Sequence, residues 1–179
     1  VGIWYGGIDA LPTPEAQRAA RLVEELGFGA LWVAEAVGRD PFVSSAVLLS
    51  GTKTLPLSTG IANIYARDPM TMNAVRLTTG EMTGGRLVLG LGVSHGHLVS
   101  KIRGHEYGKP VTTMRHYLDA MGKALFMAAK PAEDVPIVLA ALRPKMLALA
   151  AERPIVAAQI DGQSRLFTAR ADTQARQFE

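Results

Sequence analysis

The chain of 179 residues contains no cysteine, which excludes a disulfide scaffold, a thiolate nucleophile and a zinc site with thiolate ligands. No uninterrupted apolar run approaches the ~18 residues that span a bilayer, and no charged-then-apolar leader opens the chain. Neither sign of charge predominates, because the chain has 19 Lys and Arg residues and 16 Asp and Glu residues, and the basic residues form no run. We therefore expect a cytoplasmic protein that binds neither membrane nor nucleic acid.

Several common catalytic motifs are missing as well, namely the G-x-S-x-G elbow, the Walker loop, the H-E-x-x-H helix and the EF-hand loop. Ser94 and His95 leave a hydrolase open, but adjacent residues at a strand end point apart. The glycines from Gly90 to Gly96 miss the G-x-G-x-x-G spacing of a dinucleotide-binding turn, yet they indicate that the backbone lies close to a ligand or a neighbouring strand. His95 and His97 have too few further ligands nearby, so we predict no metal site.

What the chain does contain is a repeated unit, in which a short apolar run is followed by a helical pattern. The first four runs are spaced by roughly 28 residues, which suits a β-strand, a crossover helix and two short loops. Strands that are apolar on both faces predict a parallel sheet covered by helices, either as a barrel or as a doubly wound sheet. The expected strands cover residues 1–5, 30–34, 57–62, 86–91 and 136–140.

Prolines mark the starts of the expected helices. Asp-Pro pairs at 40–41 and 68–69 combine a capping side chain with a proline in the first turn. We expect Thr13 to cap the first helix and residues 112–113 to cap the fourth, while Pro144 opens the fifth.

Ligands of parallel α/β sheets bind at the carboxyl ends of the strands, so candidate site residues follow each expected strand. Glu35 ends the second strand, where a carboxylate can donate or accept a proton or hold a ligand. The alternative for Glu35 is a surface acid or a partner of a helix dipole. His95 lies nearest its strand end and is the histidine we expect to hydrogen-bond a ligand.

Four segments, taken in order, resemble the luciferase-like monooxygenase family, and more narrowly its coenzyme F420-dependent oxidoreductases. They are residues 31–35, 60–69, 84–95 and 104–110, and the resemblance covers about residues 1–152. It implies an α/β fold of the (β/α)8 TIM-barrel type, a choice that the repeats alone leave open. The barrel is expected to be incomplete, with five clear βα units and an unsettled sixth.

The resemblance also implies a cofactor, coenzyme F420 with FMN as the alternative, lying across the carboxyl ends of the strands. The family's third strand ends in a bulge with a non-prolyl cis peptide bond, which falls at Gly60–Ile61. Glu35 and His95 are the implied catalytic residues, which move the proton that accompanies hydride transfer. The implied cofactor contacts are Trp4, Gly60, Ile61, Ala62, Asn63, Gly92, Val93 and Ser94.

The expected function is hydride transfer between a small organic substrate and F420 or FMN, with monooxygenase-type chemistry also within the family. The alternative is a non-catalytic barrel remnant or partner subunit, because a closed barrel of this type needs roughly 250 residues. An open sheet edge favours a homodimer.

We expect a partial barrel domain over residues 1–152 and a divergent tail over 153–179. In the tail, the pattern predicts a short strand at 155–158 and a helix over 164–178. Two alternatives stay open, a sixth packed unit and a loosely held tail.

Overall fold

The computed structural model describes residues 1–153, 156–160 and 166–169, and its strands form one sheet in the order β1-β2-β3-β5-β6-β7-β8, with β4 beside β5. Neighbouring strands are parallel up to β7, and β8 is antiparallel to β7. The strands are β1 (Gly2–Trp4), β2 (Ala30–Val33), β3 (Leu57–Thr59), β4 (Ala62–Asn63), β5 (Leu87–Gly92), β6 (Ile137–Ala140), β7 (Val156–Ile160) and β8 (Leu166–Ala169).

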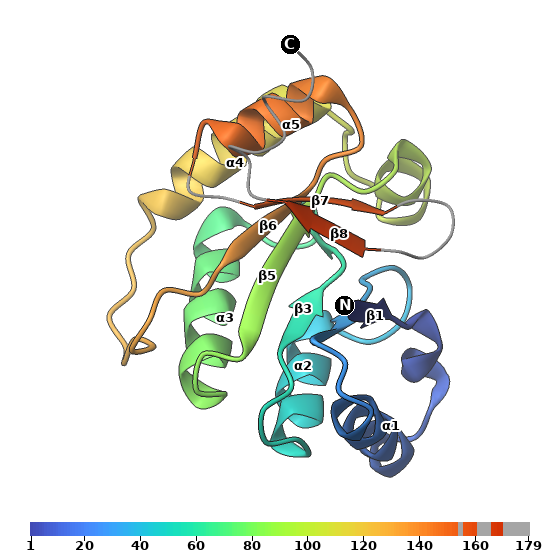
Figure 1. Cartoon of the computed structure of the whole chain (residues 1–179). Helices are drawn as coiled ribbons and strands as arrows, with labels where there is room; N and C mark the ends of the chain where they lie inside the picture. Colours follow the sequence, from blue (N-terminus) through green and yellow to red (C-terminus); the bar gives the residue numbers. More distant parts are fainter. Residues whose placement is uncertain (154–155, 161–165, 170–179) are drawn as a thin grey trace.

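Five α-helices alternate with the strands and lie around the outer side of the curved sheet (Figure 1). Each of the five expected strand-helix units is therefore confirmed. None of the helices in the described part of the chain has the length and apolar character that crossing a bilayer requires. The helices are α1 (Thr13–Glu25), α2 (Pro41–Ser50), α3 (Pro69–Met82), α4 (Pro110–Gly122) and α5 (Pro144–Ala151).

The two Asp-Pro pairs start helices as predicted. The carboxylate of Asp40 accepts hydrogen bonds from the N–H groups of Phe42 and Val43, and that of Asp68 accepts one from the N–H group of Thr71. These bonds satisfy donors that the first helical turn leaves free.

The threonine caps were predicted wrongly. Thr13 is already helical and Pro12 precedes α1, while α4 starts at Pro110, two residues before Thr112. Neither helix has a side-chain cap bond. The residues that precede these two helices are Pro12 and Lys109, whose side chains have no oxygen that could accept a cap bond.

The expected helix over 164–178 is also wrong where it can be compared, because residues 166–169 form strand β8. The sequence Leu-Phe-Thr-Ala begins with residue types that favour strands, and pairing with β7 decides the outcome. The remainder of that expected helix lies outside the described residues. The expected strand at 155–158 is confirmed as β7, shifted by one to two residues.

Two apolar clusters fill the space between the sheet and its helices. One joins α1 and α2 to β2 and β3 and includes Ala16, Leu31 and Leu57. The other surrounds β5 and includes Leu89 and Leu139. Because successive side chains alternate across a strand, Trp32 and Val138 lie on the opposite, inner face, together with Ala30 and Val88.

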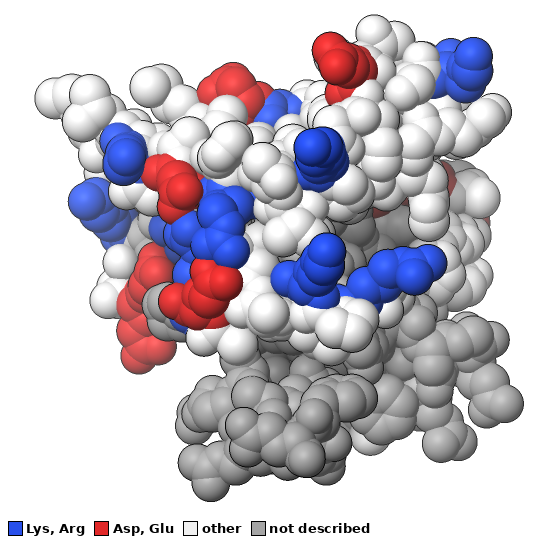
Figure 2. Space-filling view, turned by 90° about the horizontal axis from the view of Figure 1, so that it is seen from above, with Lys and Arg blue, Asp and Glu red and all other residues white. Residues whose placement is uncertain are grey.

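Ion pairs hold the end of α5 to α4. Arg115 pairs with Glu152, and Arg153 pairs with Asp119. On the face seen in Figure 2, acidic and basic side chains likewise lie next to one another. Other basic side chains in the centre and at the right of this view have no acidic side chain of the described residues beside them.

Candidate functional site

The third strand ends in a bulge. Ser58 of β3 pairs with Val88, and Ala62 of β4 pairs with Leu91. Between these two pairs, the stretch from β3 to β4 therefore has one more residue than β5. Thr59 bridges the irregular stretch, since its Oγ1 accepts a hydrogen bond from the N–H group of Gly90 at 2.9 Å and donates one to the Gly90 carbonyl oxygen at 2.7 Å.

The peptide bond between Gly60 and Ile61, inside this bulge, is cis. The bulge and the cis bond that the family resemblance implies are therefore both present, at the residues expected.

The glycines of β5 make room for this bulge. A Cβ atom on Gly90 would lie 1.8 Å from the carbonyl oxygen of Thr59, and one on Gly92 would lie 2.7 Å from the side chain of Ile61. The sequence left open whether these glycines lie close to a ligand or to a neighbouring strand. In the structure, Gly90 and Gly92 lie close to the neighbouring stretch of chain at Thr59 and Ile61.

Trp4 covers the bulge from the inner face of β1. Its indole Nε1 donates a hydrogen bond to the carbonyl oxygen of Gly60 at 3.0 Å. The Trp4 side chain packs closely against Gly60, yet 37% of the residue remains exposed. An indole in this position can contact both the protein backbone and a ligand.

Glu35 lies in a network of hydrogen bonds and ion pairs. Its side chain is only 6% exposed, and Arg67 Nη1 lies 2.9 Å from its Oε1. Arg103 Nη2 lies 3.6 Å from the same oxygen. The N–H group of Asn63 donates to Oε2 at 2.8 Å, so the carboxylate also holds the backbone that leaves the bulge.

Arg67 connects Glu35 to its surroundings. It also pairs with Asp40 and lies over the ring of Phe42 at 5.0 Å. Burial by itself would lower the pKa of Arg67, but the hydrogen bond to Asp40 and the charge of Glu35 raise it above its ordinary value. The hydroxyl of Tyr117, whose pKa is raised by burial, donates to the Arg67 carbonyl oxygen at 2.9 Å.

The long segment after β5 folds back on itself. The Tyr107 hydroxyl donates to the carbonyl oxygen of Ser94 at 3.2 Å, and Tyr65 Oη accepts a hydrogen bond from the N–H group of Gly108 at 3.0 Å. The two tyrosine rings are 5.6 Å apart. Ser94 has a φ of 56°, in the left-handed region that residues other than glycine rarely adopt.

A cavity of about 540 Å³ lies at the carboxyl ends of β5 and β6. Its volume is in the range of small-molecule and cofactor sites. Val93, Val111, Ala140, Leu142 and Met146 are among its apolar lining residues. Ser94, His95, Tyr107, Arg143 and Lys145 supply polar and charged groups.

The predicted site residues thus divide into two neighbouring groups. Trp4 and residues 60–63 gather at the bulge, and residues 93–95 line the cavity, while Gly92 contacts Ile61 between them. Glu35 is not among the residues that line this cavity. Its assignment to proton transfer, like that of His95, stays a prediction.

Sequence reasoning named none of the partners of Glu35 and none of the basic side chains of the cavity wall as site residues, although Arg143 lies in the stretch that follows the expected strand 136–140. Arg67 directly precedes the helix cap Asp68 and lies in the segment 60–69 that carries the family resemblance. That position was the sequence signal that could have identified it. Arg103 is 68 residues away from Glu35, and no local pattern connects them. Arg143 and Lys145 flank the proline that opens α5.

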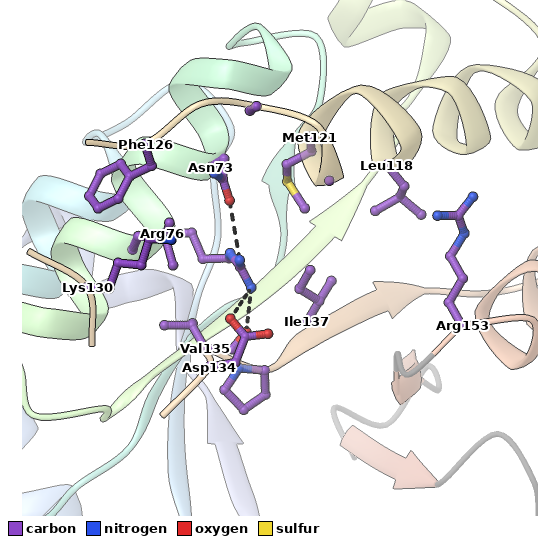
Figure 3. Close-up of a pocket in the computed structure, with 14 residues that line it drawn as sticks. Asn73, Arg76, Leu118, Met121, Phe126, Lys130, Asp134, Val135, Ile137 and Arg153 are labelled. Carbon is purple, nitrogen blue, oxygen red and sulfur yellow. Dashed lines mark hydrogen bonds and ion pairs between the residues drawn. The ribbon is translucent and has the colours of Figure 1, made fainter. Parts of the chain in front are cut away.

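A second cavity, of about 460 Å³, lies at the opposite end of the sheet, between α3, α4 and the segment that leads into β6 (Figure 3). Arg76 points across it towards Asp134, and the two form an ion pair at 3.0 Å. Arg76 also donates to the carbonyl oxygen of Val135 at 2.9 Å and to Asn73 at 3.3 Å. These contacts engage its terminal nitrogens within the protein itself.

Comparison with known proteins gives one matching family model, described as luciferase-like monooxygenase, over residues 6–158. A Mycobacterium tuberculosis protein named as a coenzyme F420-dependent oxidoreductase is 30% identical to this chain over an alignment that is 182 residues long, gaps included. The alignment covers 85% of this chain and 52% of the relative. The chain spans about half the length of the curated relatives it matches.

Two solved structures show the same fold. The coenzyme F420-dependent tetrahydromethanopterin reductase of Methanopyrus kandleri matches with a TM-score of 0.69 at 18% identity, over 85% of this chain and 53% of that one. The oxygenating constituent of 3,6-diketocamphane monooxygenase of Pseudomonas putida, in complex with FMN, matches with a TM-score of 0.70 at 15% identity, over 90% and 57%. The expected TIM-barrel type is confirmed, in a sheet that is not closed here.

Proposed function

Because the chain belongs to the luciferase-like monooxygenase family, we propose that it forms the cofactor-facing half of an oxidoreductase that uses coenzyme F420, with FMN as the alternative. The hydride passes to or from a small organic substrate. The observation that carries this proposal is the bulge at residues 59–61, covered by Trp4 and adjoining the segment that lines the cavity at Val93–His95.

The residues present fit such a cofactor. The apolar part of the cavity suits a planar ring, and Arg143, Lys145 and His95 suit the phosphate that both F420 and FMN carry. Arg143 and Lys145 form no ion pair with any residue in 1–153. At the bulge, Asn63 Nδ2 is buried without a hydrogen-bond partner in the described part of the chain, so a donor is available there.

When bound, a flavin or deazaflavin supplies a two-electron hydride carrier. The chain's own residues then bind, orient and exclude water. The backbone of residues 60–63 and 92–94 would contact the ring, and the exposed imidazole of His95 would hold or release the accompanying proton.

The names of relatives favour F420 over FMN, because the relative from Mycobacterium tuberculosis and the reductase from Methanopyrus kandleri are both named for F420. The diketocamphane enzyme, bound to FMN, supports the alternative. A homodimer, a cytoplasmic location and the division at residue 152 stay predictions.

A titration tests the proposal. We expect F420 fluorescence to be quenched when micromolar F420 is titrated with the purified chain, and FMN added in parallel decides between the cofactors. Arg143→Met combined with Lys145→Met should weaken binding by about tenfold or more, because two cations at the phosphate are lost. Arg18→Met with Lys123→Met removes the same charge elsewhere and should leave affinity unchanged.

Failure of both cofactors to bind at micromolar concentration would contradict the proposal. It would support the alternative of a non-catalytic remnant or partner subunit. Equal weakening in the control variant would show that overall charge, and not the cavity, attracts the cofactor.

A further inference from the structure

Glu35 joins three loops that meet at the carboxyl end of the sheet. Its own loop follows β2, Asn63 and Arg67 lie at the end of β4 and in the loop after it, and Arg103 belongs to the long segment after β5. The carboxylate contacts a donor from each of the other two. A single side chain thus fixes the relative positions of three stretches that are far apart in sequence.

Arg103 is the contact that reaches the segment of residues 93–109. Its Nη2 donates to the carbonyl oxygen of Ala36 at 3.1 Å and lies 3.6 Å from Glu35 Oε1. The same segment supplies Ser94, His95 and Tyr107 to the cavity wall. The Arg103 contacts therefore tie this wall to the loop after β2.

Glu35 is held in largely buried surroundings. Its side chain is 6% exposed and that of Arg67 is 12% exposed, so both ions are largely removed from water. Protonation of Glu35 would weaken its bonds to Arg67, Arg103 and the Asn63 N–H group together. All three of these donors belong to the protein itself, and Glu35 is not among the residues that line the cavity.

We propose that Glu35 is a positioning residue, which latches the 93–109 segment beside the cavity through Arg103 and holds the backbone of Asn63 through its N–H group. Proton transfer then belongs to another group. The inference rests on the proposed function only for the identity of the cavity's ligand.

Amide hydrogen exchange of the full chain without cofactor tests the latch. Arg103→Met keeps an apolar stem but loses the guanidinium group, and we expect about fivefold faster exchange in the 93–109 segment. Arg103→Lys keeps the charge and should restore part of the protection. Lys101→Met, on the same helical turn, is the matched control and should exchange as the wild type does.

Glu35→Gln should have the larger effect, about tenfold or more, because all three contacts of the carboxylate change at once. It should also shift the NMR signal of the Asn63 amide proton, whose acceptor turns from a carboxylate into a carboxamide. Should Glu35→Gln fail to fold, the Arg103 variants still decide.

Unchanged exchange in Arg103→Met would overturn the latch. So would a Glu35→Gln variant that binds F420 and exchanges as the wild type does but has lost turnover, because Glu35 would then carry the proton. A wild-type chain that binds neither F420 nor FMN contradicts the proposed function instead. The exchange comparison needs no cofactor and still decides the latch.

Discussion

Near the amino ends of the strands, Glu24 and Arg86 bind the protein's own backbone, whereas at the carboxyl ends Arg143 and Lys145 border a cavity and form no ion pair within residues 1–153. Glu24 accepts hydrogen bonds from the N–H groups of Lys53, Thr54 and Leu55, just before β3. Arg86 donates to the carbonyl oxygens of Leu49, Thr52 and Thr83, just before β5.

The carboxyl end differs in what its charges contact. Arg143, Lys145 and His95 border the 540 Å³ cavity, and Ser94 beside them has a left-handed backbone conformation. The two ends thus use their charges differently, to hold the backbone at Glu24 and Arg86 and, on the proposed function, to bind a ligand at the cavity, a division typical of barrels of this type. Glu35 and Arg67 are the exception, because they lie at the carboxyl end and serve to hold loops together.

We expect the largest effect from a substitution at Gly90, where the backbone of β5 lies closest to the backbone of the bulge. Gly90→Ala places a Cβ atom 1.8 Å from the Thr59 carbonyl oxygen, so the strands must separate at the bulge. We expect the free energy of unfolding to fall by about 3 kcal/mol or more, measured by urea denaturation. Gly122→Ala, where a Cβ atom would meet nothing within 4 Å, is the control. Equal stability of the two variants would show that the close approach at Gly90 is not needed.

Two arginine variants, one at each end of the sheet, compare how much the two ends contribute to the free energy of unfolding. Arg86→Met removes hydrogen bonds to three carbonyl oxygens, those of Leu49, Thr52 and Thr83, and we expect it to lower the free energy of unfolding by about 2 kcal/mol. Arg143→Met should leave that free energy within about 0.5 kcal/mol of wild type, because it forms no ion pair within residues 1–153. Thermal and urea unfolding of both variants measures the difference. The reverse order of effects would remove the distinction between the two ends.

The smallest expected effect is a pH dependence at the amino end. Hydrogen bonds from the backbone N–H group of Thr54, and then from those of Leu55 and Lys53, lower the pKa of Glu24 from 4.5 to about 2. A carboxyl group with a depressed folded-state pKa stabilises the fold fully above pH 4.5, and this stabilisation is lost as the pH falls towards 2.

Glu24→Gln tests this dependence by removing the titrating group. We expect wild type to exceed the variant in stability at neutral pH and the gap to close between pH 4.5 and pH 2, followed by urea unfolding at each pH. A gap that is constant over this interval would contradict the assignment to Glu24.

Much of the fold was open to prediction because its signals are local. The aspartates of the Asp-Pro pairs at 40–41 and 68–69 accept hydrogen bonds from N–H groups only two or three residues further on, so a few letters of sequence suffice. The bulge at Gly60–Ile61 was predicted only through the family resemblance. The direction of β8 was not predictable from residues 166–169, because pairing with β7 decides it.

The candidate site was predictable in part. The residues of the bulge and of the 93–95 stretch were predicted from the resemblance, and the structure brings them to one edge of the sheet. The role of Glu35 depends on Arg67 and Arg103, which lie 32 and 68 residues away.

The sequence by itself determined the repeated strand-helix units, the first turns of α2 and α3 and the absence of thiol chemistry, since each follows from residue types and near neighbours. Only the tertiary structure decided what the glycines of β5 accommodate, which cations surround Glu35 and which charges are left facing the cavity. All three features depend on contacts between residues that are far apart in sequence. Bringing such residues together costs chain entropy, and no local sequence pattern shows which pairs will meet. One carboxylate that the sequence marks as a proton carrier is thereby placed where it holds three loops together.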